Sequence, residues 1–278
     1  MSEIVYHYCS VEVFKSIIEN RKLWLASSTN TNDSMENSIV SRKLFETMSD
    51  EEDYEKYTSI FSEFDEIYKK LHVNTYISCF SMNRDLLSQW RGYADDGNGI
   101  AIGFDKKSLP EKRDIIHYSF DTENTISSNE VLYDCEDVDK FVSDCITAVK
   151  KLHTDKTKDA EDKLIIYALK LLTFNYITKS SAFSEEEEFR TVYIPFPNQG
   201  ELGAFISMKD ISDRKFRFTK NKISSYYEMN ISYNDFPKPI SEIVLGPKNK
   251  FDEDELKLFL KSNGFTDIKI TRSAATYC

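Results

Sequence analysis

The sequence is poor in the residues from which most recognisable metal and redox motifs are built. Its 278 residues include only 8 glycines, 6 prolines, 5 cysteines and 4 histidines. The cysteines are odd in number and scattered without a Cys-x-x-Cys pair, so neither a disulfide framework nor a zinc ribbon is indicated. The histidines form no His-Glu-x-x-His motif and no cluster with cysteine. We therefore expect no dependence on a metal.

Long apolar runs and an excess of positive charge are missing as well. No stretch approaches the ~20 residues of a membrane-spanning helix, and the opening MSEIVYHYC has neither a basic segment nor a signal-type apolar stretch. We expect a cytoplasmic protein that does not engage a membrane. The net charge of −11 argues against a broad basic surface that coats DNA. Residues 209–222 hold six Lys or Arg against two Asp, but their Lys-Phe-Arg-Phe core alternates as a half-exposed strand does.

Glycine-rich phosphate loops are represented only by GNGIAIG at residues 97–103. A dinucleotide-binding loop follows a strand and opens a helix, whereas this run leads into a strand, and no Gly-Lys-Ser/Thr exists to form a P-loop. We expect instead a tight turn and one glycine that lies close to another backbone. A Gly-x-Ser-x-Gly nucleophile motif is also absent.

The residues that are present predict an α+β fold. A content of 40% hydrophobic and 13% aromatic residues is ample for a core. Apolar spacing predicts strands at 3–8, 75–81, 99–104 and repeatedly from 188 onward, and helices through most of 35–72, at 136–153, at 160–178 and at 252–263. No linker or repeat divides the chain. We expect one domain over residues 1–278, whose sheet takes strands from both ends of the chain, with a mainly helical insertion at about 134–180.

Four consecutive glutamates at 185–188 stand directly before a predicted strand. In a strand, Glu186, Glu188 and Arg190 would share one face, so Arg190 could orient a neighbouring carboxylate and hold it ionised. The alternative is a solvated helix end for which Arg190 is only a salt-bridge partner. Glu188 is the candidate for a working carboxylate.

Other segments add polar and aromatic candidates for a binding pocket. They are Tyr6, His7 and Ser10 near the start of the chain, Trp90 and Tyr93 in a short helix, and Asn32 and Asp33 in a polar loop. Three of these residues also have a purely structural interpretation. His7 could be a core histidine whose ring bonds the backbone, and the rings of Trp90 and Tyr93 could simply pack in the core.

Four blocks of the chain resemble a widespread bacterial domain of unknown function. They are YHYCS…FKSIIENRKLWLASSTNTND, CFSMNRDLLSQWRGYADDGNGIAIGFD, KSSAFSEEEEFR and ISEIVLGPK…SAATY, in that order over most of the chain, from about residue 4 to 277. The order of a histidine, an aromatic residue and a glutamate at the head of a strand is in turn similar to the His-Tyr-Glu pattern of ADP-ribosyltransferases.

The second resemblance implies a split, mixed or antiparallel sheet that grips NAD. Glu188 would engage a hydroxyl of the nicotinamide ribose, Tyr93 or Trp90 would stack on nicotinamide, and His7 would bond the adenosine ribose. Such an enzyme transfers ADP-ribose to a protein or nucleic acid, or hydrolyses NAD as a glycohydrolase. Bacterial toxins and phage-defence effectors are the settings implied, with an antitoxin or defence-system protein as partner. The chain departs from the pattern because Tyr93 ends a helix rather than lying on a strand.

The chemistry suits these residue types. Breaking the bond between ribose and nicotinamide builds positive charge on the sugar, and a carboxylate hydrogen-bonded to the 2-hydroxyl stabilises that charge. Nicotinamide leaves as a neutral molecule, so no proton donor is required. Arg190 could instead bind a pyrophosphate.

Two further classes of function remain open for this chain. One is a non-catalytic module that binds a nucleotide or a protein. The other is a metal-dependent nuclease that uses the acidic run 185–188, which needs carboxylates from separate segments.

Overall fold

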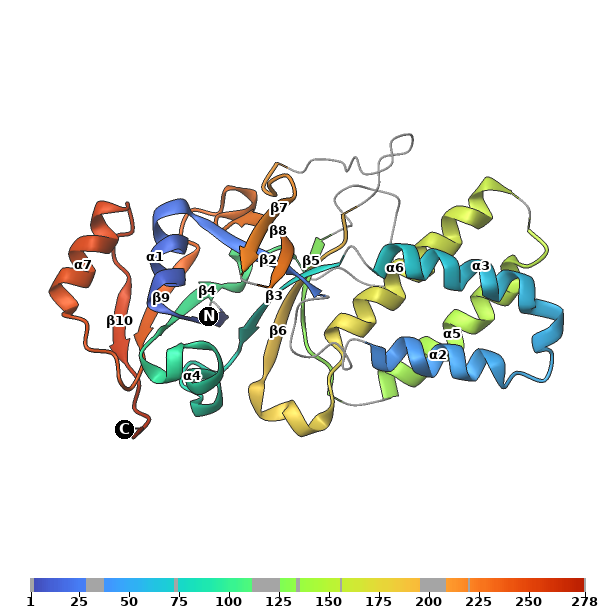
Figure 1. The fold of residues 1–278 in the computed structure, drawn as a ribbon, viewed down its shortest axis with the longest axis horizontal. Coiled ribbons are helices and arrows are strands. Elements are labelled where there is room, and N and C mark those ends of the chain that lie inside the picture. The colour runs from blue at the N-terminus through green and yellow to red at the C-terminus, as the bar shows by residue number, and fades with distance from the viewer. Residues whose placement is uncertain are drawn as a thin grey trace.

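The computed structural model describes residues 3–28, 38–72, 75–111, 126–133, 136–155, 157–195, 209–219 and 221–277. The fold is α+β, with one mixed, open sheet and helices at both ends of it (Figure 1). The strands are β1 (Ile4–Cys9), β2 (Lys22–Ser27), β3 (Tyr76–Ser81), β4 (Ile100–Asp105), β5 (Ile126–Glu130), β6 (Glu188–Tyr193), β7 (Lys215–Thr219), β8 (Lys222–Asn230), β9 (Ile240–Leu245) and β10 (Lys269–Arg272). The α-helices are α1 (Val11–Asn20), α2 (Ile39–Ser49), α3 (Tyr54–His72), α4 (Leu87–Tyr93), α5 (Glu136–Leu152), α6 (Lys158–Ile177) and α7 (Glu253–Ser262).

The sheet forks at β3. Its main path runs β10-β9-β4-β1-β3-β2-β8-β7, with parallel pairing between β9 and β10 and antiparallel pairing elsewhere. One edge of β3 pairs with β6 along its whole length, and β5 pairs with β6 in turn. The other edge is shared, because β2 pairs at Tyr76 and Ile77 whereas β1 pairs at Ser81. The α+β class and the mixed sheet are therefore confirmed.

Local sequence signals account for the helix ends. Ser10 caps α1 by accepting a hydrogen bond from the backbone N–H of Val13 at 3.3 Å. Asp252 caps α7 in the same way, and α7 stops before Asn263 and Gly264, the latter with a φ of +80°. The expected helix at 252–263 is confirmed by α7.

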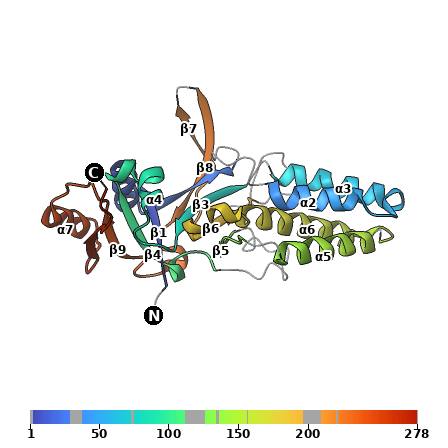
Figure 2. The ribbon, with the colours of Figure 1, turned by 90° about the horizontal axis from the view of Figure 1, so that it is seen from below.

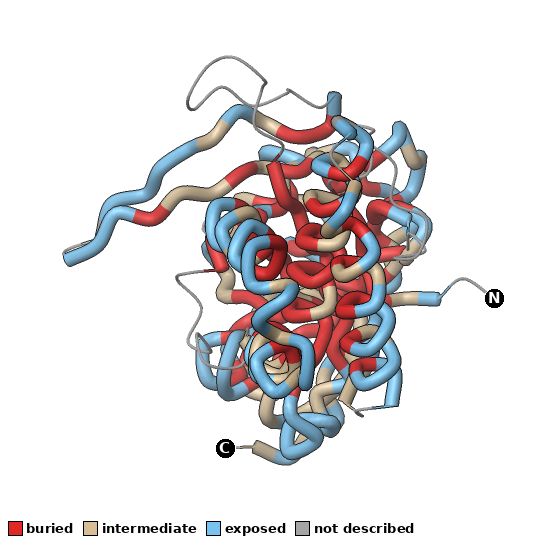
Figure 3. The backbone as a smooth tube through the Cα atoms, turned by 90° about the vertical axis from the view of Figure 1, so that its right-hand side faces the viewer, coloured by how far each residue is buried: buried red, intermediate tan, exposed pale blue. Residues whose placement is uncertain are grey.

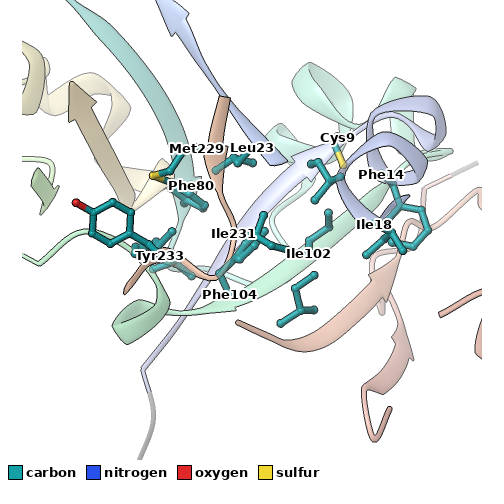
Figure 4. Close-up of a cluster of buried hydrophobic side chains, with 14 of the residues drawn as sticks. Cys9, Phe14, Ile18, Leu23, Phe80, Ile102, Phe104, Met229, Ile231 and Tyr233 are labelled. Atoms are coloured by element: carbon teal, nitrogen blue, oxygen red, sulfur yellow. The ribbon is translucent and has the colours of Figure 1, made fainter. Parts of the chain in front are cut away.

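Two apolar cores hold the elements together. The first lies between the sheet and helices α1 and α7, and Figure 4 shows part of it, with Phe14 and Ile18 of α1 beside sheet residues such as Ile102. The second joins α2, α3, α5 and α6 to the sheet through residues such as Ile77 and Val192. Figures 1 and 2 show these four helices bundled at one end, and Figure 3 shows the buried residues inside the body. Of the described helices, none is long and apolar enough to cross a membrane.

The glycine-rich run at 97–103 forms a turn before β4. Gly97 has a φ of +87°, a conformation that favours glycine. A Cβ atom on Gly99 would lie 2.2 Å from the carbonyl oxygen of Cys9. The predicted tight turn and close backbone approach are therefore both confirmed.

Candidate functional site

A buried ion pair marks the start of β6. Glu188 and Arg190 lie opposite Ser81 and Cys79 of β3, so all four side chains share one face of the sheet. Arg190 donates from Nε to Oε1 of Glu188 and from Nη2 to Oε2, both at 2.8 Å. Glu188 is 7% exposed and Arg190 is 4% exposed. The expected role of Arg190, to orient the carboxylate, matches this bidentate geometry.

A second cation and a second carboxylate extend the pair. The Nζ of Lys179 donates to Glu186 at 2.7 Å and lies 3.5 Å from Oε2 of Glu188. Burial alone would raise the pKa of Glu188, but Arg190 and Lys179 hold it below its ordinary value of 4.5. Burial likewise opposes the charge on Lys179, yet the hydrogen bond that it donates to Glu186 and the charge of Glu188 raise its pKa. Glu188, Lys179 and Arg190 are therefore charged near neutral pH.

The expectation that Glu186 shares a strand with Glu188 is wrong. Residues Ser181–Glu186 form a 3₁₀ turn, and Glu187 adopts a left-handed conformation with a φ of 42° before β6 begins. The hydroxyl of Ser81 donates to the carbonyl of Glu186 at 2.7 Å, which ties this turn to the end of β3. Glu186 nevertheless reaches the site, because the turn directs its carboxylate to Lys179.

Three more side chains complete the surroundings of Glu188. The hydroxyl of Tyr133 accepts a hydrogen bond from the backbone N–H of Glu188 at 2.9 Å. The Cys79 thiol shares the face of the sheet that carries the Glu188 carboxylate, and burial raises the pKa of this thiol. We name Cys79, Tyr133, Lys179, Glu186, Glu188 and Arg190 the Glu188 cluster. Tyr93 borders it: burial, then the charge of Glu186, raises the pKa of Tyr93 to about 12, although this residue is 56% exposed.

Sequence reasoning missed three members of the cluster, Cys79, Tyr133 and Lys179. A signal existed for Lys179, since it stands in the KSSAFSEEEEFR block just after the end of α6. A buried lysine must be paired with carboxylates, because an unpaired buried charge strongly destabilises the fold.

His7 lies on the other side of the sheet from the Glu188 carboxylate. Its ring meets Phe80 edge-on at 5.7 Å, and Phe80 points away from the face that carries Cys79 and Arg190. The Nδ1 of His7 is 3.0 Å from the backbone oxygen of Cys79, and burial lowers its pKa. This is the geometry of a core histidine bonded to backbone. Tyr93 lies close enough to Glu186 and Glu188 for their charges to raise its pKa, whereas His7 is on the opposite side of the sheet from Glu188.

The remaining candidates from the first strand and the short helix are engaged in packing or hydrogen bonds. Trp90 is fully buried, donates from Nε1 to Asp85 at 2.7 Å and packs edge-on against Tyr8 at 4.7 Å, so its ring faces are not open to a ligand. Tyr6 donates to Glu242 at 3.0 Å, and burial followed by this hydrogen bond raises the pKa of Tyr6 to about 12. Ser10 caps α1.

Two candidates, Asn32 and Asp33, lie outside the described residues.

The carboxylates that a nuclease would need are already paired with cations. Glu188 is bonded to Arg190 and Glu186 to Lys179, whereas Glu185 is exposed. Among the residues that the structure describes, no group of three or more His, Cys, Asp or Glu side chains is arranged to hold a metal ion.

Comparison with known proteins finds a family model that is similar to the segment containing most of the site. Residues 89–191 match the model of DUF2971, described as a protein of unknown function. The expected resemblance to a family of unknown function is thereby confirmed for this segment, whereas the first and last of the four predicted blocks lie outside the match. This DUF2971 segment runs from α4 to β6 and includes Tyr93 and every member of the Glu188 cluster except Cys79. No curated protein and no solved structure matches the chain.

Lowering the pH should reveal how much the Glu188–Arg190 pair contributes to the free energy of unfolding. Because the pKa of Glu188 is lowered in the folded state, its pairing stabilises the fold above the ordinary pKa of 4.5 and is lost as the pH falls through the folded pKa. We expect the free energy of unfolding to fall less steeply below that pH in the double variant Glu188→Gln/Arg190→Met than in the wild type. Urea unfolding over a pH series measures this, and parallel curves would show that the pair does not titrate as described.

Proposed function

We propose that the chain is an NAD-dependent enzyme of the ADP-ribosyltransferase type, with Glu188 as its catalytic carboxylate. The observation that supports this most is a carboxylate held ionised at the head of a strand, with an exposed aromatic ring within range of its charge. Arg190 and Lys179 maintain the charge, and Tyr93 supplies the ring. The acceptor of the ADP-ribose is a protein, a nucleic acid or water.

Glu188 would act on the charge that develops in the sugar. As the bond between the ribose carbon and the nicotinamide nitrogen breaks, its electron pair goes to the nitrogen, so nicotinamide leaves neutral and the sugar becomes an oxocarbenium ion. An ionised carboxylate that is only 7% exposed interacts strongly with such a cation because little water screens it. The nucleophile then bonds the sugar carbon and releases a proton.

The bidentate pair leaves Glu188 able to accept another hydrogen bond. An ionised carboxylate has about four lone-pair positions on its two oxygens, and Arg190 takes one on each. A ribose hydroxyl can therefore bond Glu188 while Arg190 stays in place. Tyr93 would lie against the planar nicotinamide, with about half of its surface available for stacking. His7 and Trp90 have packing roles in this scheme.

Release of nicotinamide from NAD tests the proposal. We expect Glu188→Gln to lower the rate by about 100-fold or more, because the amide keeps the shape but not the charge. The matched control is Glu185→Gln, which removes an exposed carboxylate three positions earlier and should leave the rate unchanged. The assay is run with water as the only acceptor and again with a bacterial lysate that supplies acceptors.

The outcome is interpretable only if both variants fold. Circular dichroism and thermal melting verify this before rates are compared. Undiminished nicotinamide release by folded Glu188→Gln would remove Glu188 from the reaction. No release by the wild type under either condition would reject the enzymatic proposal.

A non-catalytic nucleotide-binding module is the second candidate. It is favoured by the internal charge balance of the cluster, in which Glu186 and Glu188 are matched by Lys179 and Arg190. For a binding module, NAD would raise the melting temperature according to its affinity, without release of nicotinamide. The two readouts therefore separate the candidates.

A further inference from the structure

The β7–β8 hairpin stands away from the body of the protein. Figures 2 and 3 show it projecting from the far end of the sheet path, with most of its outer part exposed. The two strands pair from Lys215 opposite Tyr226 to Thr219 opposite Lys222. Its base is anchored, because β8 pairs with β2 and buries Tyr227 and Met229 in the core. The hairpin is thus a fixed arm with two accessible faces.

The charge of this arm is opposite to that of the rest of the chain. Residues 214–222 contain five Lys or Arg and no Asp or Glu. Since the whole chain has a net charge of −11, the remaining residues together carry −16. A cationic segment that projects from an acidic protein favours a polyanionic partner and places the contact on the arm, because the acidic body repels the same partner.

One face of the arm combines three of these cations with stacked aromatic rings. The strand register puts Trp24 of β2, Tyr226 of β8 and the hairpin cations Lys215, Arg217 and Lys222 on the same side. Glu228, opposite Trp24, shares this side at its inner end and accepts a hydrogen bond from Lys215 at 2.7 Å. Trp24 stacks on Tyr226 with ring centroids 4.2 Å apart and an angle of 28°, and it remains 40% exposed. The guanidinium of Arg217 lies 5.9 Å from the Trp24 ring. We name the two rings and the three cations the Trp24 face.

The opposite face has a different character. It presents Phe216, Phe218 and Ile223, which are 56%, 75% and 61% exposed, and none of Lys215, Arg217 and Lys222. Arg214, at the base of the arm, lies on this side and donates to the hydroxyl of Tyr227 at 3.2 Å. Pairing of β7 with β7 of a second copy could cover these rings, but it would bring the cations of two identical strands together, which is destabilising. This apolar side therefore serves as an internal comparison for the Trp24 face.

We propose that the Trp24 face binds single-stranded nucleic acid. Unpaired bases stack on the Trp24 and Tyr226 rings, and Arg217 and Lys222 contact the phosphates, while Lys215 is paired with Glu228. Aromatic platforms beside cations are the common means of holding single strands without sequence preference. A duplex offers its phosphates but not the faces of its bases, so it lacks half of the interaction. This site is independent of the NAD chemistry proposed above.

Fluorescence anisotropy of labelled oligothymidine and oligouridine tests the proposal on the full chain. We expect a dissociation constant of about 1–100 µM at physiological salt. Trp24→Ala should weaken binding about tenfold through loss of stacking. Arg217→Glu/Lys222→Glu should weaken it further and reduce the slope of log affinity against log salt by about 0.7 for each lost phosphate contact. The control Phe216→Ser/Phe218→Ser, on the other side of the same hairpin, should bind as the wild type does.

Intrinsic fluorescence provides a second readout that does not require a disruptive variant. The chain has two tryptophans, and Trp90 is fully buried whereas Trp24 is 40% exposed. Oligonucleotide binding should therefore quench the Trp24 emission, and the folded Trp24→Phe variant should lose the quenching while retaining most of the affinity.

Four results would overturn the proposal. They are absence of oligonucleotide binding by the wild type, equal binding by all variants, loss of binding in Phe216→Ser/Phe218→Ser but not in Trp24→Ala, and tighter binding of a duplex than of the single strand. If anionic phosphatidylserine vesicles bind and oligonucleotides do not, the arm is a membrane contact and the proposal fails in the same way.

Discussion

Replacing Arg190 by methionine is expected to lower the free energy of unfolding by about 3–5 kcal/mol. The substitution removes the bidentate partner of Glu188, a carboxylate that is only 7% exposed, and leaves a buried charge with reduced compensation. It also removes the donor to the backbone carbonyl of Tyr176, which Arg190 bonds at 2.9 Å. Urea denaturation followed by circular dichroism measures the change.

A surface ion pair provides the matched control for Arg190. Lys163 pairs with Asp159 on α6, and both side chains are largely exposed. Lys163→Met should leave the free energy of unfolding nearly unchanged, because water solvates the remaining charge. Glu188→Gln/Arg190→Met should recover much of the loss of Arg190→Met, since both charges are then absent. If Arg190→Met cost no more than Lys163→Met, the cluster would not be the buried charge pair described above.

Replacing Gly99 by alanine is expected to destabilise the fold by about 3 kcal/mol. The new Cβ atom would lie 2.2 Å from the carbonyl oxygen of Cys9 and 2.8 Å from backbone atoms of Ala94, and none of these can rotate away as a side chain would. Gly246→Ala should behave alike, because its Cβ would lie 2.4 Å from the carbonyl oxygen of Gly97. Urea denaturation again measures the free energy of unfolding.

Gly92 is the control within the same stretch of chain. It lies inside α4, and a Cβ atom there would have no neighbour within 4 Å. Gly92→Ala should therefore stabilise the protein by about 0.5–1 kcal/mol, through better helix propensity and lower unfolded-state entropy. Equal effects of Gly92→Ala and Gly99→Ala would contradict the close approach of backbones at Gly99.

Helices and strands whose signals are local were predictable. Asp252 and the Asn263-Gly264 pair bracket α7, and the start of β6 at Glu188 follows from the β-branched and aromatic run after the glutamates. Local signals did not predict that the helices of residues 35–72 and 136–178 pack in one bundle. Apolar faces show that helices need partners, but not which partners they find.

The candidate site likewise has one part that the local sequence predicts and another that depends on strand pairing. Glu188 and Arg190 are two apart on a strand, so the alternation of side chains puts them together whatever the rest of the chain does. Alternation also separates Tyr6 from His7, but whether His7 points toward Glu188 depends on the pairing of Tyr6 with Ser81 and of Ser81 with Glu188. That register places His7 on the far side.

The amino-acid sequence by itself determined the α+β class, the glycine turn before β4, and a glutamate paired with an arginine at the head of a strand, because each depends on residues close together in the chain. Only the tertiary structure decided that Lys179, Cys79 and Tyr133 surround Glu188 while His7 does not, and that the cations of β7 share a face with Trp24. These neighbours come from segments far apart in sequence. Their meeting is set by strand register and by the fork at β3, which no local pattern encodes.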